Sequence, residues 1–207
     1  RDEKIRRAGL MDGKLKRTAE ALSRRGFTVT CCAAPAEAAA FVRSLAAEAK
    51  TVGFGGSRTL AELDLPALLA ADGKEILRHG DPKWSPDEKM DVMRRELTCD
   101  LFLLSANALT EDGRLVNIDG NGNRVAASIF GPHRVAFVVG RNKIVSGGLD
   151  AAVERIKRVA CPPNCRRLNR RTPCAETGVC ADCQSPDRIC RVTGVLDRCP
   201  TRTQTHV

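Results

Sequence analysis

Residues 100–124 read DLFLLSANALTEDGRLVNIDGNGNR. This stretch opens with an almost wholly apolar run, residues 101–104, of the kind that forms a strand buried on both faces of a sheet. A polar block rich in glycine follows at once. In parallel sheets the carboxyl ends of the strands form the ligand-binding edge, so the block is expected to line a cleft.

Strands and helices alternate on both sides of this run. The predicted strands cover residues 27–31, 51–54, 74–79, 100–104, 114–118 and 134–139. The predicted helices cover residues 3–25, 36–50, a segment from about 59, 86–97, 124–130 and 149–159. This order predicts an α/β fold, with a mostly parallel sheet flanked by helices.

Composition excludes several classes of protein. With 207 residues, 43% hydrophobic and 29% charged, the chain can bury a core, which excludes a disordered or fibrous protein. Its apolar runs are far shorter than the roughly 20 residues of a membrane-spanning helix. The first residues form a charged amphipathic run without the apolar core of a secretory signal, so a cytoplasmic location is expected.

The net charge of +9 comes from the two ends of the chain. Residues 27–160 balance at 17 basic and 17 acidic side chains. Only seven aromatic side chains, six Phe and one Trp, are available to stack on bases. The sequence therefore argues against a nucleic-acid partner.

A glycine-rich turn follows the predicted strand 51–54. Gly55 and Gly56 let backbone approach a ligand, and the hydroxyls of Ser57 and Thr59 stand at the start of the next helix. This pattern suits an anion-binding loop. It equally suits a plain strand-to-helix turn in which a hydroxyl caps the helix.

The polar block after residue 104 supplies the other candidate cleft residues. They are Thr110, Glu111, Asn117, Asp119 and Asn123. Two carboxylates in one cleft, Glu111 and Asp119, suit general acid–base catalysis. The alternative is purely structural, because Gly113 and Gly120 each follow an aspartate, as in hairpin turns.

Seven of the ten cysteines lie in the last 47 residues. Cys174, Cys180, Cys183 and Cys190 form a C-x5-C-x2-C-x6-C pattern, whose four thiolates suit a 4Fe–4S cluster or zinc. A single C-x2-C pair with uneven flanking spacing favours iron–sulfur over zinc, and free or disulfide-bonded thiols come last. We therefore predict two parts, an α/β domain at 1–160 and a metal-binding tail at 161–207 packed on it.

The remaining cysteines have simpler interpretations. Cys161 and Cys165 are expected to be additional thiols beside the metal site, or a labile disulfide, more than ligands. Cys31, Cys32 and Cys99 lie in apolar strand contexts, where cysteine usually serves as a small core residue.

Three segments resemble the LUD-domain family of lactate-utilisation-type proteins. They are Gly-Gly-Ser-Arg-Thr at 55–59, the block from 108–113 to 122–124, and the stretch from Gly-Pro at 131–132 to 139–145. The resemblance covers residues 1 to about 200, and the cysteine pattern is similar to that of a short, cysteine-tailed branch. It implies a fold similar to ribose-5-phosphate isomerase and CoA transferases. It also implies a cleft that includes Lys143 as a third catalytic candidate, beside Glu111 and Asp119.

The family resemblance, together with the cleft and the tail, implies the expected function. We expect an iron–sulfur protein that oxidises or processes lactate or a similar small hydroxycarboxylate, binds a carboxylate or phosphate, and works with redox partner subunits. The alternatives are an electron-transfer or regulatory module without its own catalysis, and a zinc-stabilised enzyme of the isomerase or transferase type.

Overall fold

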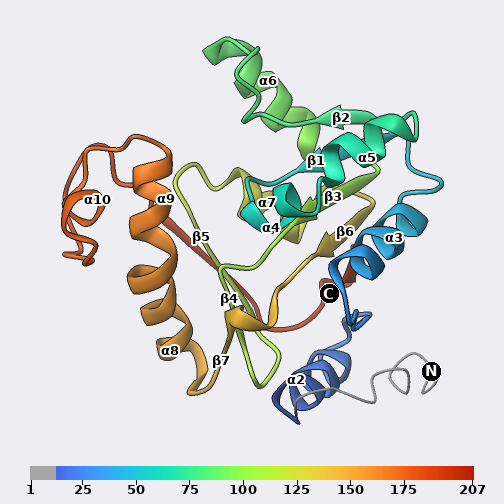
Figure 1. Ribbon diagram of the computed structural model, residues 1–207, viewed down its shortest axis with the longest axis horizontal. Helices are drawn as coiled ribbons and strands as arrows, with labels where there is room; N and C mark the ends of the chain where they lie inside the picture. The colour runs from blue at the N-terminus through green and yellow to red at the C-terminus, as the bar shows by residue number, and fades with distance from the viewer. Residues whose placement is uncertain (1–12) are drawn as a thin grey trace.

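Five parallel strands form the central sheet of the computed structural model, which describes residues 13–207 (Figure 1). The strand order is β2-β1-β3-β6-β9. Their bounds are β1 Thr51–Phe54, β2 Glu75–Leu77, β3 Leu101–Leu104, β6 Arg134–Phe137 and β9 Gln204–His206. The decisive strand β3 therefore lies at the centre of the sheet.

Helices cover both faces of this sheet, as the alternation of side chains along β3 shows. Leu101 and Leu103 pack with the apolar side chains of α3, α4 and α5, whereas Phe102 and Leu104 join those of α6 and α7. The helices are α3 Pro35–Leu45, α4 Arg58–Glu62, α5 Leu65–Ala71, α6 Pro86–Glu96 and α7 Asn123–Ile129. The predicted α/β fold, with a mostly parallel sheet flanked by helices, is confirmed.

A second sheet, of order β7-β4-β5-β8, was not predicted. Its strands are β4 Ala108–Thr110, β5 Leu115–Asp119, β7 Ile144–Val145 and β8 Val192–Leu196. β4 and β5 form an antiparallel hairpin, whose turn contains Gly113 at φ +88°, a backbone conformation that favours glycine. The structural alternative for the polar block, a hairpin followed by a helix, is thus present in the fold.

One continuous helical stretch packs against the second sheet. It runs through α8 (Gly148–Arg155), the π-helical turn η2 (Ile156–Ala160) and α9 (Cys161–Arg167). Ala152, Ile156 and Cys161 bury their side chains against Ala108 and Val116 of the hairpin. The domain boundary expected after residue 160 falls inside this stretch.

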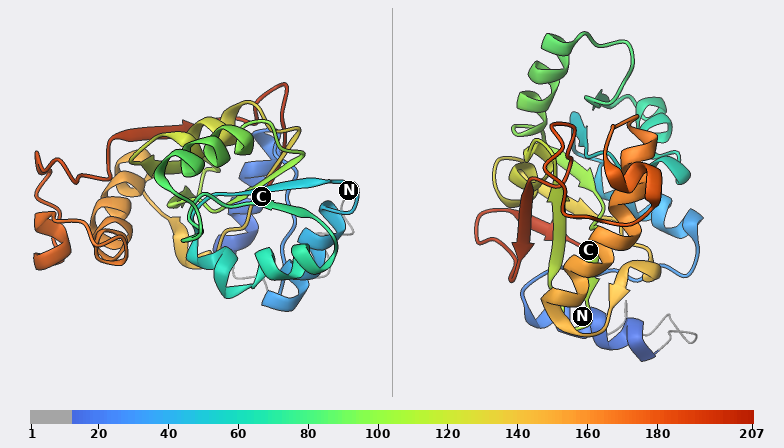
Figure 2. Two further views of the ribbon diagram at one scale, coloured as in Figure 1. Left: turned by 90° about the horizontal axis from the view of Figure 1, so that it is seen from above. Right: turned by 90° about the vertical axis from the view of Figure 1, so that its left-hand side faces the viewer.

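The cysteine-rich tail supplies strands to both sheets. β8 pairs antiparallel with β5, and β9 pairs parallel with β6 at the edge of the central sheet. Between α9 and β8 lies the short helix α10 (Pro173–Thr177), which Figure 2 shows at one end of the molecule, away from the parallel sheet. The last 47 residues therefore complete the α/β fold while carrying one projecting segment.

The two N-terminal predictions hold in part. The first helix is observed as α2 (Gly13–Arg24), and the rest of its predicted range lies outside the described residues. The predicted strand 27–31 forms only an isolated bridge, between Thr28 and His206 of β9. Within residues 13–207, no helix combines the length and the apolar character needed to cross a membrane.

Candidate functional site

Lys143 lies at the carboxyl edge of the central sheet. It ends the 3-10 helix η1 (Arg141–Lys143), which follows β6. Its Nζ donates hydrogen bonds to Oγ of Ser105 at 2.7 Å and to Oγ1 of Thr59 at 3.0 Å. Ser105 directly follows β3, and Thr59 lies in α4 after β1. One amine thus joins the segments that leave three adjacent parallel strands.

The surroundings of Lys143 disfavour its charged form. Burial, followed by the positive charges of Arg155 and Arg124, lowers the pKa of Lys143 to about 8, and Glu62 opposes the shift. Among residues 13–207, no carboxylate forms an ion pair with Lys143. A lysine in this state is suited to proton transfer or nucleophilic attack near neutral pH.

Arg155 is a second partly buried cation without a carboxylate partner in the described part of the chain. Its guanidinium donates to the backbone carbonyls of Asn107 at 2.6 Å and Asn142 at 3.0 Å. Burial lowers its pKa as well. Two of its five N–H groups are accounted for by these bonds, and the others remain for a ligand or water.

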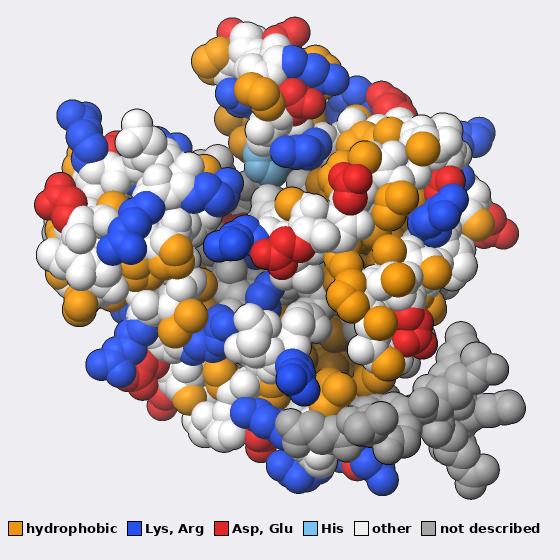
Figure 3. Space-filling view, in the orientation of Figure 1, with side chains coloured by type: hydrophobic (Ala, Val, Ile, Leu, Met, Phe, Trp, Pro, Cys, Tyr) orange, Lys and Arg blue, Asp and Glu red, His pale blue; other side chains and the backbone are white. Residues whose placement is uncertain are grey.

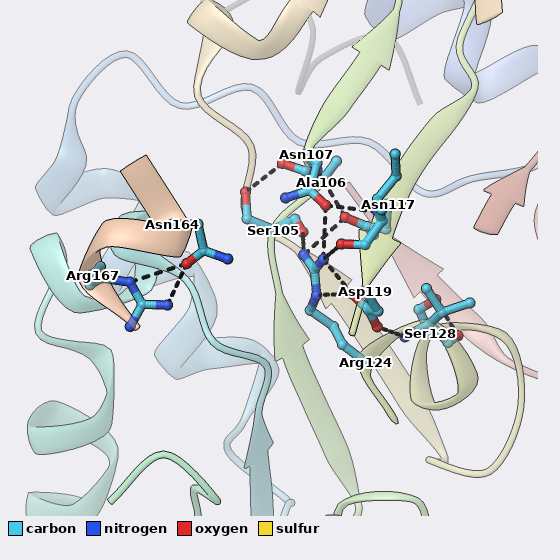
Figure 4. A network of polar contacts seen from close by, with 11 residues as sticks. Ser105, Ala106, Asn107, Asn117, Asp119, Arg124, Ser128, Asn164 and Arg167 are labelled. Carbon is cyan, nitrogen blue, oxygen red and sulfur yellow. Dashed lines mark hydrogen bonds and ion pairs between the residues drawn. The ribbon is translucent and has the colours of Figure 1, made fainter. Parts of the chain in front are cut away.

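Arg124, from α7, is by contrast fully engaged (Figure 4). Its Nε donates to Asp119 at 2.9 Å, Nη1 to Oδ1 of Asn117 at 3.0 Å, and Nη2 to Oδ1 of Asn107 at 2.8 Å. Nη1 also donates to the carbonyl of Ser105 at 3.2 Å. Asp119 forms an ion pair with Arg124, and the network fixes the backbone on which Ser105 stands.

The glycine-rich turn meets this network. A Cβ on Gly55 would lie 2.9 Å from Cδ of Arg124, so only glycine lets β1 approach the arginine this closely, whereas Gly56 faces open space. The hydroxyl of Ser57 caps α4 by accepting from the backbone N–H of Leu60 at 3.4 Å. The turn is thus a capped strand-to-helix connection that also brings Thr59 to Lys143.

The structure does not bring Glu111 and Thr110 to this group. Both lie at the far end of the β4–β5 hairpin, where the backbone N–H of Arg114 donates to Thr110 at 2.9 Å. Glu111 accepts from Ser146 at 2.9 Å and pairs with Lys14 of α2 at 3.5 Å. The hairpin carries these residues away from the carboxyl edge, because β4 runs outward before β5 returns.

Asn117 and Asn123, both predicted from sequence, each keep a buried side-chain N–H without a partner among residues 13–207. Asn117 is only 1% exposed. Each of these amide groups can therefore donate a hydrogen bond to a polar ligand. Together with Asp119, these two residues are the members of the polar block that the fold returns to the carboxyl edge.

Sequence reasoning missed Ser105, Arg124 and Arg155 as site residues. Ser105 carried a signal, since it is the first residue after the most apolar strand. Arg124 and Arg155 gave none, because an arginine on a helix is usually a solvated surface residue.

Figure 3 shows this face hollowed between the side formed by α8 and α9 and the side formed by α4, with Lys and Arg side chains in and around the hollow. A cavity of about 250 Å³ is lined by Arg141, Asn142 and Ile144, which flank Lys143, together with α2 residues. Another, of about 440 Å³, lies between α8–η2 and residues 180–182. Lys143 lines neither cavity. The site is therefore described by the hydrogen bonds of Lys143 at the open edge of the sheet and not by a cavity.

The tail brings Cys165 of α9 against Cys174 of α10, with their Sγ atoms 3.7 Å apart. Both are buried, as is Cys161, against which Cys190 packs. Burial and the neighbouring thiols, that of Cys190 foremost, raise the pKa of Cys161 to about 12. Cys161 and Cys165 therefore lie close to Cys190 and Cys174, two of the four expected metal ligands.

Cys174, one of the four expected metal ligands, lies closest to a thiol outside that set. The 3.7 Å separation of Cys165 and Cys174 matches the edge of a tetrahedral zinc–thiolate site, about 3.8 Å for Zn–S bonds of about 2.3 Å. Over residues 13–207, however, no group of three or more Cys, His, Asp or Glu side chains is arranged to hold a metal ion. The donor chemistry fits a thiophilic metal, but the arrangement does not form an assembled site.

Comparison with known proteins gives two matches. A family model described as "LUD domain" matches residues 15–207. A crystal structure of a DUF162 family protein from Deinococcus radiodurans superposes with a TM-score of 0.52 at 18% sequence identity, covering 94% of this chain and 95% of that one. At this identity the likeness establishes a shared fold. No curated protein matches the chain.

Proposed function

The chain belongs to the LUD-domain family, and from that premise we propose that it binds and processes a small carboxylate at the site formed by Lys143, Arg155 and Ser105. Lactate or a similar hydroxycarboxylate is the preferred substrate class. Phosphate is the competing anion.

The observation that carries this proposal is the uncompensated charge of Lys143 and Arg155. Arg124 has an ion-pair partner in Asp119, whereas the other two cations have no carboxylate partner in the described residues. Holding two partly buried like charges together is costly unless an anion joins them. A carboxylate matches the remaining N–H groups of Arg155, because guanidinium binds carboxylates in a fork geometry.

The groups around these cations suit a hydroxyl-bearing acid. Ser105 and Thr59 present hydroxyls beside the Lys143 amine, and Asn117 and Asn123 keep free amide donors. With a pKa of about 8, Lys143 can give or take a proton near neutral pH. Asp119 is committed to Arg124 and to the backbone N–H of Val125, so Lys143 is the better acid–base candidate.

Calorimetric titration with lactate, glycolate and phosphate tests the proposal. Replacing Arg155→Gln should weaken carboxylate binding by about tenfold or more, the value of a charged hydrogen-bonded pair. Arg158→Gln, on the same helical stretch but exposed, is the matched control and should bind as the unmodified chain does. If Arg155→Gln bound these anions undiminished, the proposed site would be wrong.

We further propose that the tail thiols bind a thiophilic metal, a 4Fe–4S cluster first and zinc second. The proposal is supported by the spacing of Cys174, Cys180, Cys183 and Cys190 and by the gathering of buried thiols around Cys161. A cluster would supply one-electron transfer to redox partner subunits, whereas zinc would hold the projecting segment in shape. Metal analysis with an absorption spectrum after anaerobic purification distinguishes the two, and a metal-free protein with an ordered tail would refute both.

A further inference from the structure

Lys143 combines an amine, two hydroxyl neighbours and a nearby guanidinium, and this combination points to a specific chemistry. We propose that Lys143 is a nucleophile that forms an imine with the carbonyl of a 2-oxo carboxylate, the oxidised counterpart of a hydroxycarboxylate. The inference rests on the proposed function, because Arg155 is to hold the carboxylate of that ligand.

The contacts of Lys143 differ from those of a structural lysine. A lysine that stabilises a fold by an ion pair keeps its proton, since the carboxylate favours the ammonium form. Among residues 13–207, Lys143 instead donates hydrogen bonds to the neutral hydroxyls of Ser105 and Thr59, and the cations Arg155 and Arg124 outweigh the one acidic neighbour, Glu62. Desolvation and a second cation are the two usual means of activating a lysine for attack on carbonyls.

The lowered pKa of Lys143 increases the fraction of reactive, neutral amine. With a pKa of about 8, roughly 10% of the Lys143 amine is neutral at pH 7, against roughly 0.03% for an ordinary lysine. Glu62, which opposes the shift, forms its ion pair with Arg58 at 3.6 Å and leaves Lys143 without one. The site thus provides a nucleophilic amine at neutral pH.

Burial distinguishes the amine from the neighbouring hydroxyl as the attacking group. Ser105 is 3% exposed, whereas Lys143 is partly exposed at the open edge. A ligand that enters from solvent and pairs with Arg155 therefore reaches the amine before the hydroxyl. Ser105 is then a positioning residue, whose hydroxyl lies 2.7 Å from the nitrogen and can pass a proton.

The reaction balances without an added reagent. The Lys143 nitrogen forms a bond to the carbonyl carbon, and the carbonyl oxygen takes up a proton to give a carbinolamine. Loss of that oxygen as water leaves the C=N bond, and both protons of the neutral amine depart with the water. Neither oxidant nor reductant takes part.

Borohydride trapping with pyruvate as the probe tests the inference. The full chain is incubated with pyruvate, reduced, digested and mapped by mass spectrometry. We expect the reduced adduct at Lys143, at least about tenfold above that at Lys157, a partly exposed lysine of the nearby turn η2. Excess lactate should suppress it, and Lys143→Arg, which keeps the charge, should lose it.

The outcomes separate the inference from the proposed function. Equal trapping at all lysines, or none at Lys143 while lactate still binds in an Arg155-dependent manner, would overturn the imine and leave the anion site standing. Absence of both trapping and lactate binding would overturn both. An adduct on Ser105 in place of Lys143 would also overturn the assignment.

Discussion

Lys143 and Ser105, which follow the adjacent parallel strands β6 and β3, meet through a hydrogen bond of 2.7 Å between Nζ and Oγ. The bond joins the two strand ends at the centre of the sheet, where doubly covered parallel sheets bind their ligands. We expect it also to favour the protonated amine, because a hydrogen bond to the ammonium form favours that form.

Ser105→Ala should therefore lower the pKa of Lys143 further, because the ammonium loses an acceptor and keeps its cationic neighbours. The pH midpoint for labelling of Lys143 with acetic anhydride, read by mass spectrometry, measures this shift. Ser146→Ala, whose hydroxyl contacts Glu111, is the control and should leave the midpoint unchanged. An unchanged or higher midpoint in Ser105→Ala would show that the bond does not stabilise the charged form.

The depressed pKa of Lys143 also predicts how stability depends on pH. Between about pH 8 and 10.5 the unfolded chain holds a proton on Lys143 that the folded chain has lost. The contribution of Lys143 to the free energy of unfolding therefore rises with pH across that window and is lowest below pH 8. Lys143→Met removes the cost of burying this charge. At pH 7 the free energy of unfolding of the variant should exceed that of the unmodified chain by about 1–3 kcal/mol, and the difference should vanish near pH 10.5. Urea unfolding at both pH values measures this, and a difference independent of pH would contradict it.

Breaking the Asp119–Arg124 pair should destabilise the fold strongly. Their side chains are 5% and 11% exposed, so Asp119→Ala leaves a buried guanidinium without its counter-charge. We expect a loss of about 3–5 kcal/mol in the free energy of unfolding. Asp72→Ala, which breaks the more exposed pair with Arg43, should cost far less. If the two variants lost similar free energies of unfolding, burial would not strengthen the Asp119–Arg124 pair.

Neighbouring glycines of the turn should respond differently to the same added methyl group. In Gly55→Ala the new Cβ meets Arg124 at 2.9 Å and Leu104 at 3.1 Å, which should cost about 1–3 kcal/mol and disturb the site. Gly56→Ala meets nothing within 4 Å and should unfold as the unmodified chain does. Gly56→Val should weaken anion binding without loss of stability, if ligand lies over the turn. Thermal unfolding and lactate titration of the three variants check these outcomes.

Metal content of single cysteine variants distinguishes two possible ligand sets. Cys183 belongs only to the set expected from spacing, Cys165 only to the close pair of the structure, and Cys174 to both. Cys174→Ser should lose metal in either case. If the spacing set is right, Cys183→Ser also loses metal and Cys165→Ser keeps it. The reverse result would assign the site to the pair, and full metal in all three would exclude both sets.

The sequence was sufficient for β1, β3 and β6, the middle strands of the central sheet, because apolar residues dominate each of them. It was insufficient for β4, β7 and β9, strands of two or three residues whose pairing depends on partners far along the chain. Lys143 emerged from family resemblance, whereas Ser105 and Arg155 are recognisable only once the fold brings them to the same edge. Glu111 was expected in the cleft from its place in the sequence, but the hairpin turn after Thr110 carries its carboxylate to Lys14 of α2.

We propose that one small carboxylate binds between Lys143 and Arg155. A crystal structure of the chain grown with oxalate, an unreactive dicarboxylate, tests it most directly. We expect oxalate density within hydrogen-bond distance of both Nζ of Lys143 and the guanidinium of Arg155, and none there in Arg155→Gln. Oxalate bound elsewhere while this edge holds only water would contradict it.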